Sequence, residues 1–340
     1  MAASRLQVAA EWPASSSVQE GDPAFVCGLD EAARLGGGAF GVVFRAKLRG
    51  EIVAAKRFHI LHDPSMYGIT RTSLAVVKRE IIGEIIALAA LGNHEHVIGF
   101  RGVVVGTCFV HRRAVEGLPK WICMEYAGGG SLHLRIHGAD DDSDDGEVRP
   151  PPALGLIEMA RIVREAAMGL AFIHERDYIH RDIKPMNIML SEDGVVKLGD
   201  LGLARVVRNI GTLMSRPLTA CGTAPYNAPE INVTDGEQGE YGPARDIYAL
   251  GITATEMVLR ERPATTHALR LHQVERAAVQ EPQLEEIVRR CTQTDPARRI
   301  TAAALVASIA RLVPDAVPAA ARVVAVDVRV FDPDEPPPDY

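Results

Sequence analysis

The chain has 340 residues, of which 47% are hydrophobic and 24% are charged, and its 37 basic and 44 acidic side chains give a formal net charge of −7. This length suits one two-lobed unit or two domains, and the negative charge gives no general attraction to nucleic acid or anionic lipid. The five cysteines lack the paired spacing of a zinc site or disulfide framework, and no apolar run reaches the about 18 residues of a membrane span, so we expect a cytoplasmic or nuclear protein.

The first half of the chain is predicted to be rich in strands. Residues 1–28 are rich in Ala and Ser and aperiodic, so we expect a flexible leader. Between residues 29 and 125, the stretches ARLGGGAFGVVFRAKL and GEIVAAKRF resemble consecutive strands joined by a turn at Arg49 and Gly50. One helix is predicted over about residues 74–91, because apolar residues recur there every three or four positions.

The second half of the chain is predicted to be mainly helical. Three glycines at 128–130 indicate a flexible crossing, and we place a hinge at 125–130 and a helical region at 131–313. Leu156–Glu175 carries an apolar stripe and is predicted to be an amphipathic helix. The acidic stretch at 138–153 is interpreted as a solvated insertion in preference to a docking site for a basic partner, and residues 314–340 as a tail rich in Pro and acid.

The stretch GGGAFG at 36–41 has the G-x-G-x-x-G pattern, which any glycine-rich hairpin can match. A dinucleotide-binding fold needs these glycines to open a helix, but Val42, Val43 and Phe44 continue as a strand. This context favours a hairpin that closes over phosphates, since glycine lets backbone amides approach a polyphosphate without an intervening side chain.

Lys56 ends an apolar strand in VAAK, where an inward amine is costly unless an anion meets it. Its partner should be an acid on the predicted helix, either Glu80 or Glu84. Positions four apart share a helix face, and Glu84 is followed at that spacing by Leu88, whereas Glu80 is followed by Glu84. We therefore predict a pair between Lys56 and Glu84.

The stretch HRDIKPMN at 180–187 gathers polar groups at a density that a polar turn alone or a ligand site could explain. The oxygens of Asn187 and of Asp200 in GDLG suit Mg²⁺, a hard cation that prefers oxygen ligands. Asp182 is then available to accept a proton from a hydroxyl, and Lys184 to neutralise charge on a moving phosphoryl group.

These motifs resemble the eukaryotic protein kinase family over about Leu35 to Val313. LGGGAFGVV, VAAK, MEYAGGGSL, HRDIKPMN, GDLG, CGTAPYNAPE, DIYALG and DPARRIT occur in family order. The resemblance implies an α+β, two-lobed fold with a small β-rich N-lobe (29–125), which holds one main helix, and a larger, mainly helical C-lobe (131–313).

The resemblance also implies an ATP and Mg²⁺ site. Lys56 would hold the α- and β-phosphates and pair with Glu84, Asp182 would be the catalytic base, Lys184 would lie beside the transferred phosphate, and Asn187 and Asp200 would hold Mg²⁺. The implied nucleotide-contacting residues, besides Lys56, are those of the glycine loop and of the adenine pocket: Leu35, Gly36, Gly37, Gly38, Ala39, Phe40, Gly41, Val43, Ala54, Met124, Glu125, Ala127 and Met189.

Lys184 and Thr223 stand where serine/threonine kinases differ from tyrosine kinases, so the resemblance implies protein substrates with Ser or Thr acceptors. Arg181 would bind a phosphate on Thr219, added by an upstream kinase or by autophosphorylation. A solvated, unmodified threonine is the alternative reading of Thr219.

Three further residues are implied to be structural. Glu230 and Arg299 would form a buried pair, and Asp246 would cap the backbone of the catalytic loop from a buried helix.

Two other functions compete with an active kinase. A pseudokinase would act as a nucleotide-binding scaffold, but such proteins commonly lose the lysine, the base or the metal aspartate, and Lys56, Asp182 and Asp200 are present. A small-molecule phosphotransferase would not need CGTAPYNAPE to hold a peptide.

Two histidine pairs, His133 with His137 and His94 with His96, could suggest a metal. Two ligands without a third do not make a zinc site, so we interpret them as surface or core histidines.

Overall fold

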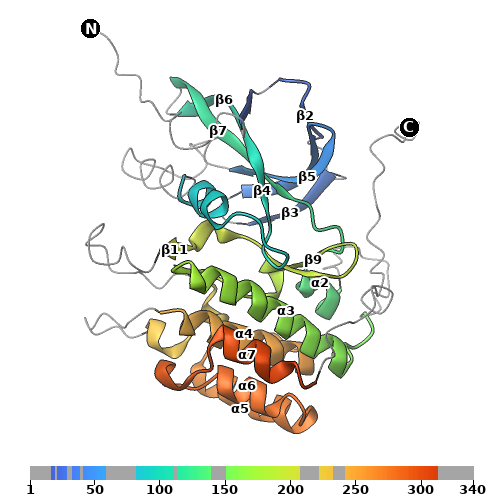
Figure 1. Cartoon of the computed structure of the whole chain (residues 1–340), viewed down its shortest axis with the longest axis vertical. Helices are drawn as coiled ribbons and strands as arrows, with labels where there is room; N and C mark the ends of the chain where they lie inside the picture. The colour runs from blue at the N-terminus through green and yellow to red at the C-terminus, as the bar shows by residue number, and fades with distance from the viewer. Residues whose placement is uncertain are drawn as a thin grey trace. The chain divides into compact units, whose positions relative to one another are not determined.

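The computed structural model describes residues 17–19, 21–28, 33–38, 41–58, 82–110, 113–138, 151–206, 222–232 and 242–312. These residues divide into two compact units: one runs to residue 126 without 94–97, and the other comprises 94–97 and the residues from 127 onward. In Figure 1 the first unit carries the large sheet and the second the helices α2 to α7. The predicted α+β, two-lobed fold is therefore confirmed.

The first unit is built on a seven-stranded sheet with the order β1-β6-β7-β5-β4-β2, in which β3 also pairs with β4. Its strands are β1 Ser17–Gln19, β2 Phe25–Cys27, β3 Arg34–Gly38, β4 Gly41–Leu48, β5 Glu51–Phe58, β6 Phe100–Val110 and β7 Arg113–Glu125. The predicted turn between β4 and β5 is confirmed: Arg49 and Gly50 have φ of 53° and 86°. Glycine adopts this left-handed conformation without a steric cost.

One face of the sheet carries a core cluster built around β4 and Trp121. Alternate residues of β4, Phe44, Ala46 and Leu48, are buried, as the period of two in a strand requires. Phe44 meets the ring of Trp121 edge to face at 5.9 Å between centroids. Aromatic pairs favour this arrangement, so the ring contact adds to the burial energy.

Residues 17–28 correct the predicted flexible leader. β1 pairs in parallel with β6, and β2 pairs with β4. Val18 is buried in the core, and the Phe25 ring lies 5.6 Å from that of Trp121. The apolar contacts of these two side chains explain why such short segments join the sheet. Residues 1–16 lie outside the described residues.

The helix of this unit is described over residues 82–91. Ile85, Leu88 and Leu91, three members of the predicted stripe, are at most 3% exposed. The rest of the predicted span, residues 74–81, lies outside the described residues.

The second unit is mainly helical, as predicted. Its helices are α2 Leu132–His137, α3 Leu156–Glu175, α4 Ala244–Leu259, α5 His267–Gln280, α6 Glu285–Cys291 and α7 Ala302–Ile309. Its short strands are β8 Tyr178–Ile179, β9 Ile188–Leu190, β10 Val196–Leu198 and β11 Arg205–Val206. The bounds of α3 are those predicted from its apolar stripe.

Helix α4 forms the centre of this unit. Every residue from 245 to 258 is buried, and α3, α5 and α6 pack against it (Figure 1). A helix buried on all sides can hold polar side chains only where they meet partners. Thr253 and Thr255 bond carbonyls of α4 itself, whereas Asp246 reaches the loop at 180–181.

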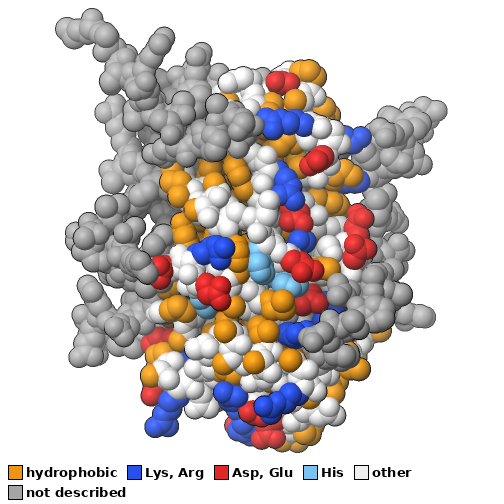
Figure 2. Space-filling view, in the orientation of Figure 1, with side chains coloured by type: hydrophobic (Ala, Val, Ile, Leu, Met, Phe, Trp, Pro, Cys, Tyr) orange, Lys and Arg blue, Asp and Glu red, His pale blue; other side chains and the backbone are white. Residues whose placement is uncertain are grey.

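The described surface carries no single dominant charge on the face drawn in Figure 2, where acidic and basic side chains are interspersed. Among the described helices, none is long and apolar enough to cross a lipid bilayer. Most of the acidic insertion (139–150) and the tail (314–340) lie outside the described residues.

Candidate active site

The glycine-rich stretch forms a hairpin, as predicted, and does not open a helix. Gly36, Gly37 and Gly38 of β3 pair with Val43, Val42 and Gly41 of β4. A side chain at Gly41 would collide with the backbone carbonyl of Arg57 on β5. Gly41 therefore allows close strand packing where the hairpin meets the sheet. Ala39 and Phe40, at the tip, lie outside the described residues.

Lys56 and Glu84 lie in contact in the first unit. The Lys56 Nζ atom is 2.8 and 2.9 Å from the two carboxylate oxygens of Glu84, and the residues are 7% and 3% exposed. Each charge compensates the cost of burying the other, which is the condition for keeping both inside a protein. The pair predicted from the spacing of Glu84 and Leu88 is thus brought together.

The residues predicted to surround adenine come from both units. In the first, Ala54 of β5 is paired with Met124 of β7, and Met124 is 8% exposed. Glu125 is fixed by Gly99, whose amide donates to the Glu125 carboxylate at 3.0 Å.

The remaining adenine-site residues differ in exposure. In the first unit, Val43 is half-buried, while Leu35 is 43% exposed. In the second, Ala127 is buried and Met189 lies half-buried on β9. Contact of these residues with a nucleotide stays a prediction.

Asp182 is the centre of a polar network in the second unit. Its Oδ1 accepts hydrogen bonds from the Thr223 amide at 3.0 Å and the Thr223 hydroxyl at 2.8 Å. Its Oδ2 accepts from Asn187 Nδ2 at 2.9 Å and lies 2.8 Å from Lys184 Nζ. Lys184 also donates to the Thr223 hydroxyl at 2.7 Å. The structure thus brings together three residues predicted to act in phosphoryl transfer, Asp182, Lys184 and Asn187, with the predicted substrate-loop residue Thr223.

Asp246 of α4 supports the backbone of this loop. Its carboxylate accepts from the amides of His180 and Arg181 at 2.9 and 2.8 Å, and it lies 2.9 Å from His174 Nε2. Burial alone would raise the pKa of Asp246, but the hydrogen bond and charge of His174 and the loop contacts bring it below its ordinary value. Arg181 has φ of 74°, so Asp246 holds the loop in a conformation that non-glycine residues rarely adopt.

His180 and Asn187 connect the loop to Asp200. The fully buried His180 donates from Nε2 to the Gly199 carbonyl at 2.9 Å, and the Gly199 amide donates to the Asn187 carbonyl at 2.8 Å. Gly199, the residue before Asp200, is therefore held through both its carbonyl and its amide. Asp200 itself is exposed and has φ of 55°.

The donor set fits Mg²⁺. The side-chain nitrogen of Asn187 donates to the Asp182 backbone carbonyl at 2.8 Å and to Asp182 Oδ2 at 2.9 Å. The side-chain oxygen of Asn187 is therefore the atom that can bind a cation. The Asp200 carboxylate supplies a second oxygen donor, and Mg²⁺ is bound through one or two such ligands together with phosphate oxygens and waters.

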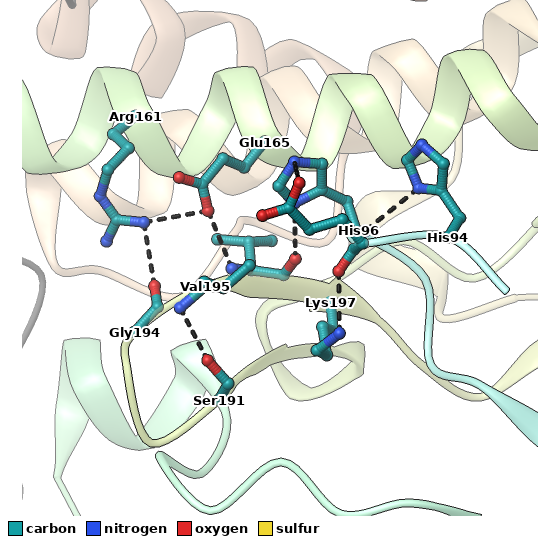
Figure 3. Close-up of polar contacts among 10 residues, drawn as sticks. His94, His96, Arg161, Glu165, Ser191, Gly194, Val195 and Lys197 are labelled. Carbon is teal, nitrogen blue, oxygen red and sulfur yellow. Dashed lines mark hydrogen bonds and ion pairs between the residues drawn. The ribbon is translucent and has the colours of Figure 1, made fainter. Parts of the chain in front are cut away.

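A second polar network holds the hairpin of β9 and β10 against α3 (Figure 3). Glu165 Oε2 accepts from the Val196 amide at 2.9 Å, and Arg161 Nη1 donates to the Gly194 carbonyl at 2.9 Å and to Glu165 at 3.0 Å. His96 Nδ1 lies 3.0 Å from the Val196 carbonyl. The sequence did not single out Arg161 or Glu165, although their spacing of four residues on one helix face was a weak signal.

The predicted pair of Glu230 and Arg299 forms a two-pronged contact in the second unit. The Nη1 and Nη2 atoms of Arg299 lie 2.6 and 2.7 Å from the two oxygens of Glu230. The Arg299 guanidinium also lies 5.0 Å from the centre of the Tyr248 ring, a cation–π distance.

Arg181 and Thr223 line a pocket that also includes Arg245, Asp246 and Tyr226. Two of the lining side chains are guanidinium groups and two, those of Asp182 and Asp246, are carboxylates, so the lining carries charges of both signs. Thr219, the predicted phosphorylation site, lies outside the described residues.

Comparison with known proteins adds to this geometry. Residues 29–309 match the family model described as the protein kinase domain. Serine/threonine-protein kinase 1 of Arabidopsis thaliana is 32% identical over 79% of this chain and 29% of its own length. Serine/threonine-protein kinase sid1 of Schizosaccharomyces pombe is 34% identical over 70% of this chain and 42% of its own length. Serine/threonine-protein kinase mos of Xenopus laevis is 35% identical over 68% of this chain and 57% of its own length.

Proposed function

Because the chain belongs to the protein kinase family, we propose that it transfers the γ-phosphate of ATP to serine or threonine hydroxyls of protein substrates. The names of its curated relatives support the serine/threonine class, and the chain spans at most 57% of the length of these three relatives. The observation that carries the proposal is the network of Asp182, Lys184, Asn187 and Thr223.

Asp182 is proposed as the general base. A carboxylate offers about four lone pairs, and the Thr223 amide and hydroxyl, Asn187 and Lys184 occupy all four. A substrate hydroxyl can therefore reach Asp182 only if one of these donors moves. Lys184 is the one with an alternative partner, because its charge would be attracted to the transferred phosphoryl group.

Asn187 and Asp200 are proposed to hold Mg²⁺. Bound there, the ion would neutralise charge on the phosphate oxygens. In the chain itself, Gly199 is held by His180 and Asn187, which limits the positions that the Asp200 carboxylate can reach. Lys56, paired with Glu84, would contact the α- and β-phosphates.

A pseudokinase scaffold is the competing function, and none of the observations favours it. The lysine, base and metal aspartate of the family pattern are all present, and Lys56 has a carboxylate partner. The proposed partners are protein substrates, with an upstream kinase or autophosphorylation acting at Thr219. Location in the cytoplasm or nucleus stays a prediction.

The test is phosphorylation of a generic Ser/Thr protein substrate by the full chain, compared with Asp182→Asn. We expect a loss in kcat of at least about a hundredfold, which is the usual contribution of a positioned base. Nucleotide binding, measured by calorimetry with Mg²⁺, should change little, because Asp182 is not among the proposed ATP contacts. Equal turnover by both proteins would reject Asp182 as the base, and absence of nucleotide binding to the folded wild type would reject the kinase proposal.

A further inference from the structure

Two histidines of α2 meet a glutamate of α4 in the second unit. His133 and His137 are one helical turn apart, with ring centroids 4.9 Å from each other. The sequence offered these two ligands without a third. The structure adds Glu256, whose carboxylate is part of a cluster in which one ligand atom from each residue lies within 4.8 Å of the others.

The Glu256 carboxylate is oriented by two contacts. Its Oε2 accepts a hydrogen bond from the Tyr226 hydroxyl at 2.6 Å, while its Oε1 lies 2.8 Å from His137 Nε2. Oε1 is therefore the oxygen presented to the histidine, and a ligand bound there can leave the Tyr226 contact intact.

The cluster combines a buried interior with a route of entry. His133 and Glu256 are 5% and 1% exposed, whereas the His137 side chain is 18% exposed. A buried carboxylate is stable only beside positive charge or hydrogen-bond donors. Tyr226 supplies a donor at Oε2, and a cation that enters past His137 would supply positive charge at Oε1.

Arg262 lies beside His133, one of the two histidine ligands. Its Nη2 atom lies 2.9 Å from His133 Nε2, and the residue is exposed. The guanidinium therefore competes with a metal for His133, and a move into solvent would break its contacts with His133 and the Tyr226 hydroxyl.

We propose that His133, His137 and Glu256 form a site for a transition-metal ion of the Zn²⁺ type, which Arg262 partly blocks. Two imidazoles and one carboxylate are a known zinc donor set, with water as the fourth ligand. Tetrahedral bonds of about 2.0 to 2.2 Å separate two ligand atoms by about 3.4 Å, so His137 and Glu256 need to part by about 0.6 Å. The nitrogen ligands distinguish this site from the all-oxygen Mg²⁺ site proposed at Asn187 and Asp200.

The experiment is a titration of the full chain with Zn²⁺ in excess Mg²⁺, followed by calorimetry, and with Co²⁺, followed by its ligand-field absorption. We expect His137→Gln to weaken Zn²⁺ binding at least about tenfold and to remove the tetrahedral Co²⁺ spectrum. His272→Gln, a change at an exposed histidine outside the cluster, should bind as the wild type does. Arg262→Gln should bind Zn²⁺ at least about threefold more tightly, because it removes a nearby exposed positive charge.

Two results would overturn the proposal. One is absence of Zn²⁺ binding to both the wild type and Arg262→Gln, which would make the cluster a hydrogen-bonded network only. The other is equal Zn²⁺ affinity in the wild type and in His137→Gln, which would place any bound ion elsewhere on the chain. His137 is partly exposed, and circular dichroism of the variant checks that it folds.

Discussion

Replacing Arg299 with lysine keeps the positive charge but removes the planar, five-donor guanidinium. All five of its N–H groups have acceptors: the two Glu230 oxygens and the backbone carbonyls of Gln293, Thr294 and Ala244, at 2.6 to 3.2 Å. A lysine ammonium has three donors. At least two acceptors in this enclosed site therefore lose their partner.

The size of the effect follows from that count. The Arg299 side chain is 0% exposed and that of Glu230 15% exposed, so water cannot readily replace the lost donors. An unsatisfied buried acceptor costs about 1 to 3 kcal/mol, and two of them predict a loss of about 2 to 6 kcal/mol in the free energy of unfolding. Arg298 offers a matched control, because its side chain is 78% exposed and lies 3.6 Å from Asp295. Arg298→Lys should change stability by less than about 0.5 kcal/mol.

The assay is urea unfolding followed by helical circular dichroism, which reports mainly on the second unit because the long helices lie there. We expect a clearly lower urea midpoint for Arg299→Lys than for Arg298→Lys, with similar slopes. If the two variants unfold at the same urea concentration, the reasoning that shape and donor count at Arg299 decide stability is wrong.

Two further predictions concern the supports of the site. Gly169→Ala should lower the melting temperature, because the added methyl group would lie 2.5 Å from the His96 carbonyl oxygen. This clash should outweigh the about 1 kcal/mol by which alanine is more favourable than glycine in a helix. Gly242→Ala is the control, because its added methyl group would meet nothing within 4 Å. Asp246→Asn should destabilise the fold near neutral pH. The pKa of Asp246 in the folded protein is lower than the about 3.9 of an aspartate in the unfolded chain. The stabilisation that its charge gives to the fold is therefore fully present above the unfolded pKa, and it is lost as the pH falls through the folded pKa. The difference in melting temperature between wild type and Asp246→Asn should therefore shrink on acidification, and a constant difference would contradict the assignment.

The parts of the fold that the sequence predicted correctly are those with local signals. The bounds of α3 follow from an apolar stripe of period 3.6, and the turn at Arg49 and Gly50 from a glycine between two strand-like runs. The pair of Lys56 and Glu84 joins residues 28 positions apart, yet one helix supplied few candidate acids, and the spacing to Leu88 selected one of them.

The parts that the sequence missed depend on distant partners. β1 and β2 have three residues each, too few to show a period, and they are strands because β6 and β4 supply hydrogen-bond partners. Glu165 bonds the amide of Val196, 31 residues later, and no local pattern indicates which backbone amide a buried carboxylate meets. The same holds for Glu256, which lies 119 residues from His137.

The catalytic loop shows why motif and geometry are separate problems. HRDIKPMN supplies the reactive groups, but the left-handed backbone at Arg181 is held by Asp246, 65 residues away on α4. Asp246 can remain charged there because His174 and the loop amides surround it, and the burial of α4 keeps water from competing. The position of Asp182 is therefore determined by a core helix as much as by its own loop, and a change in α4 should alter catalysis without touching a substrate-binding residue.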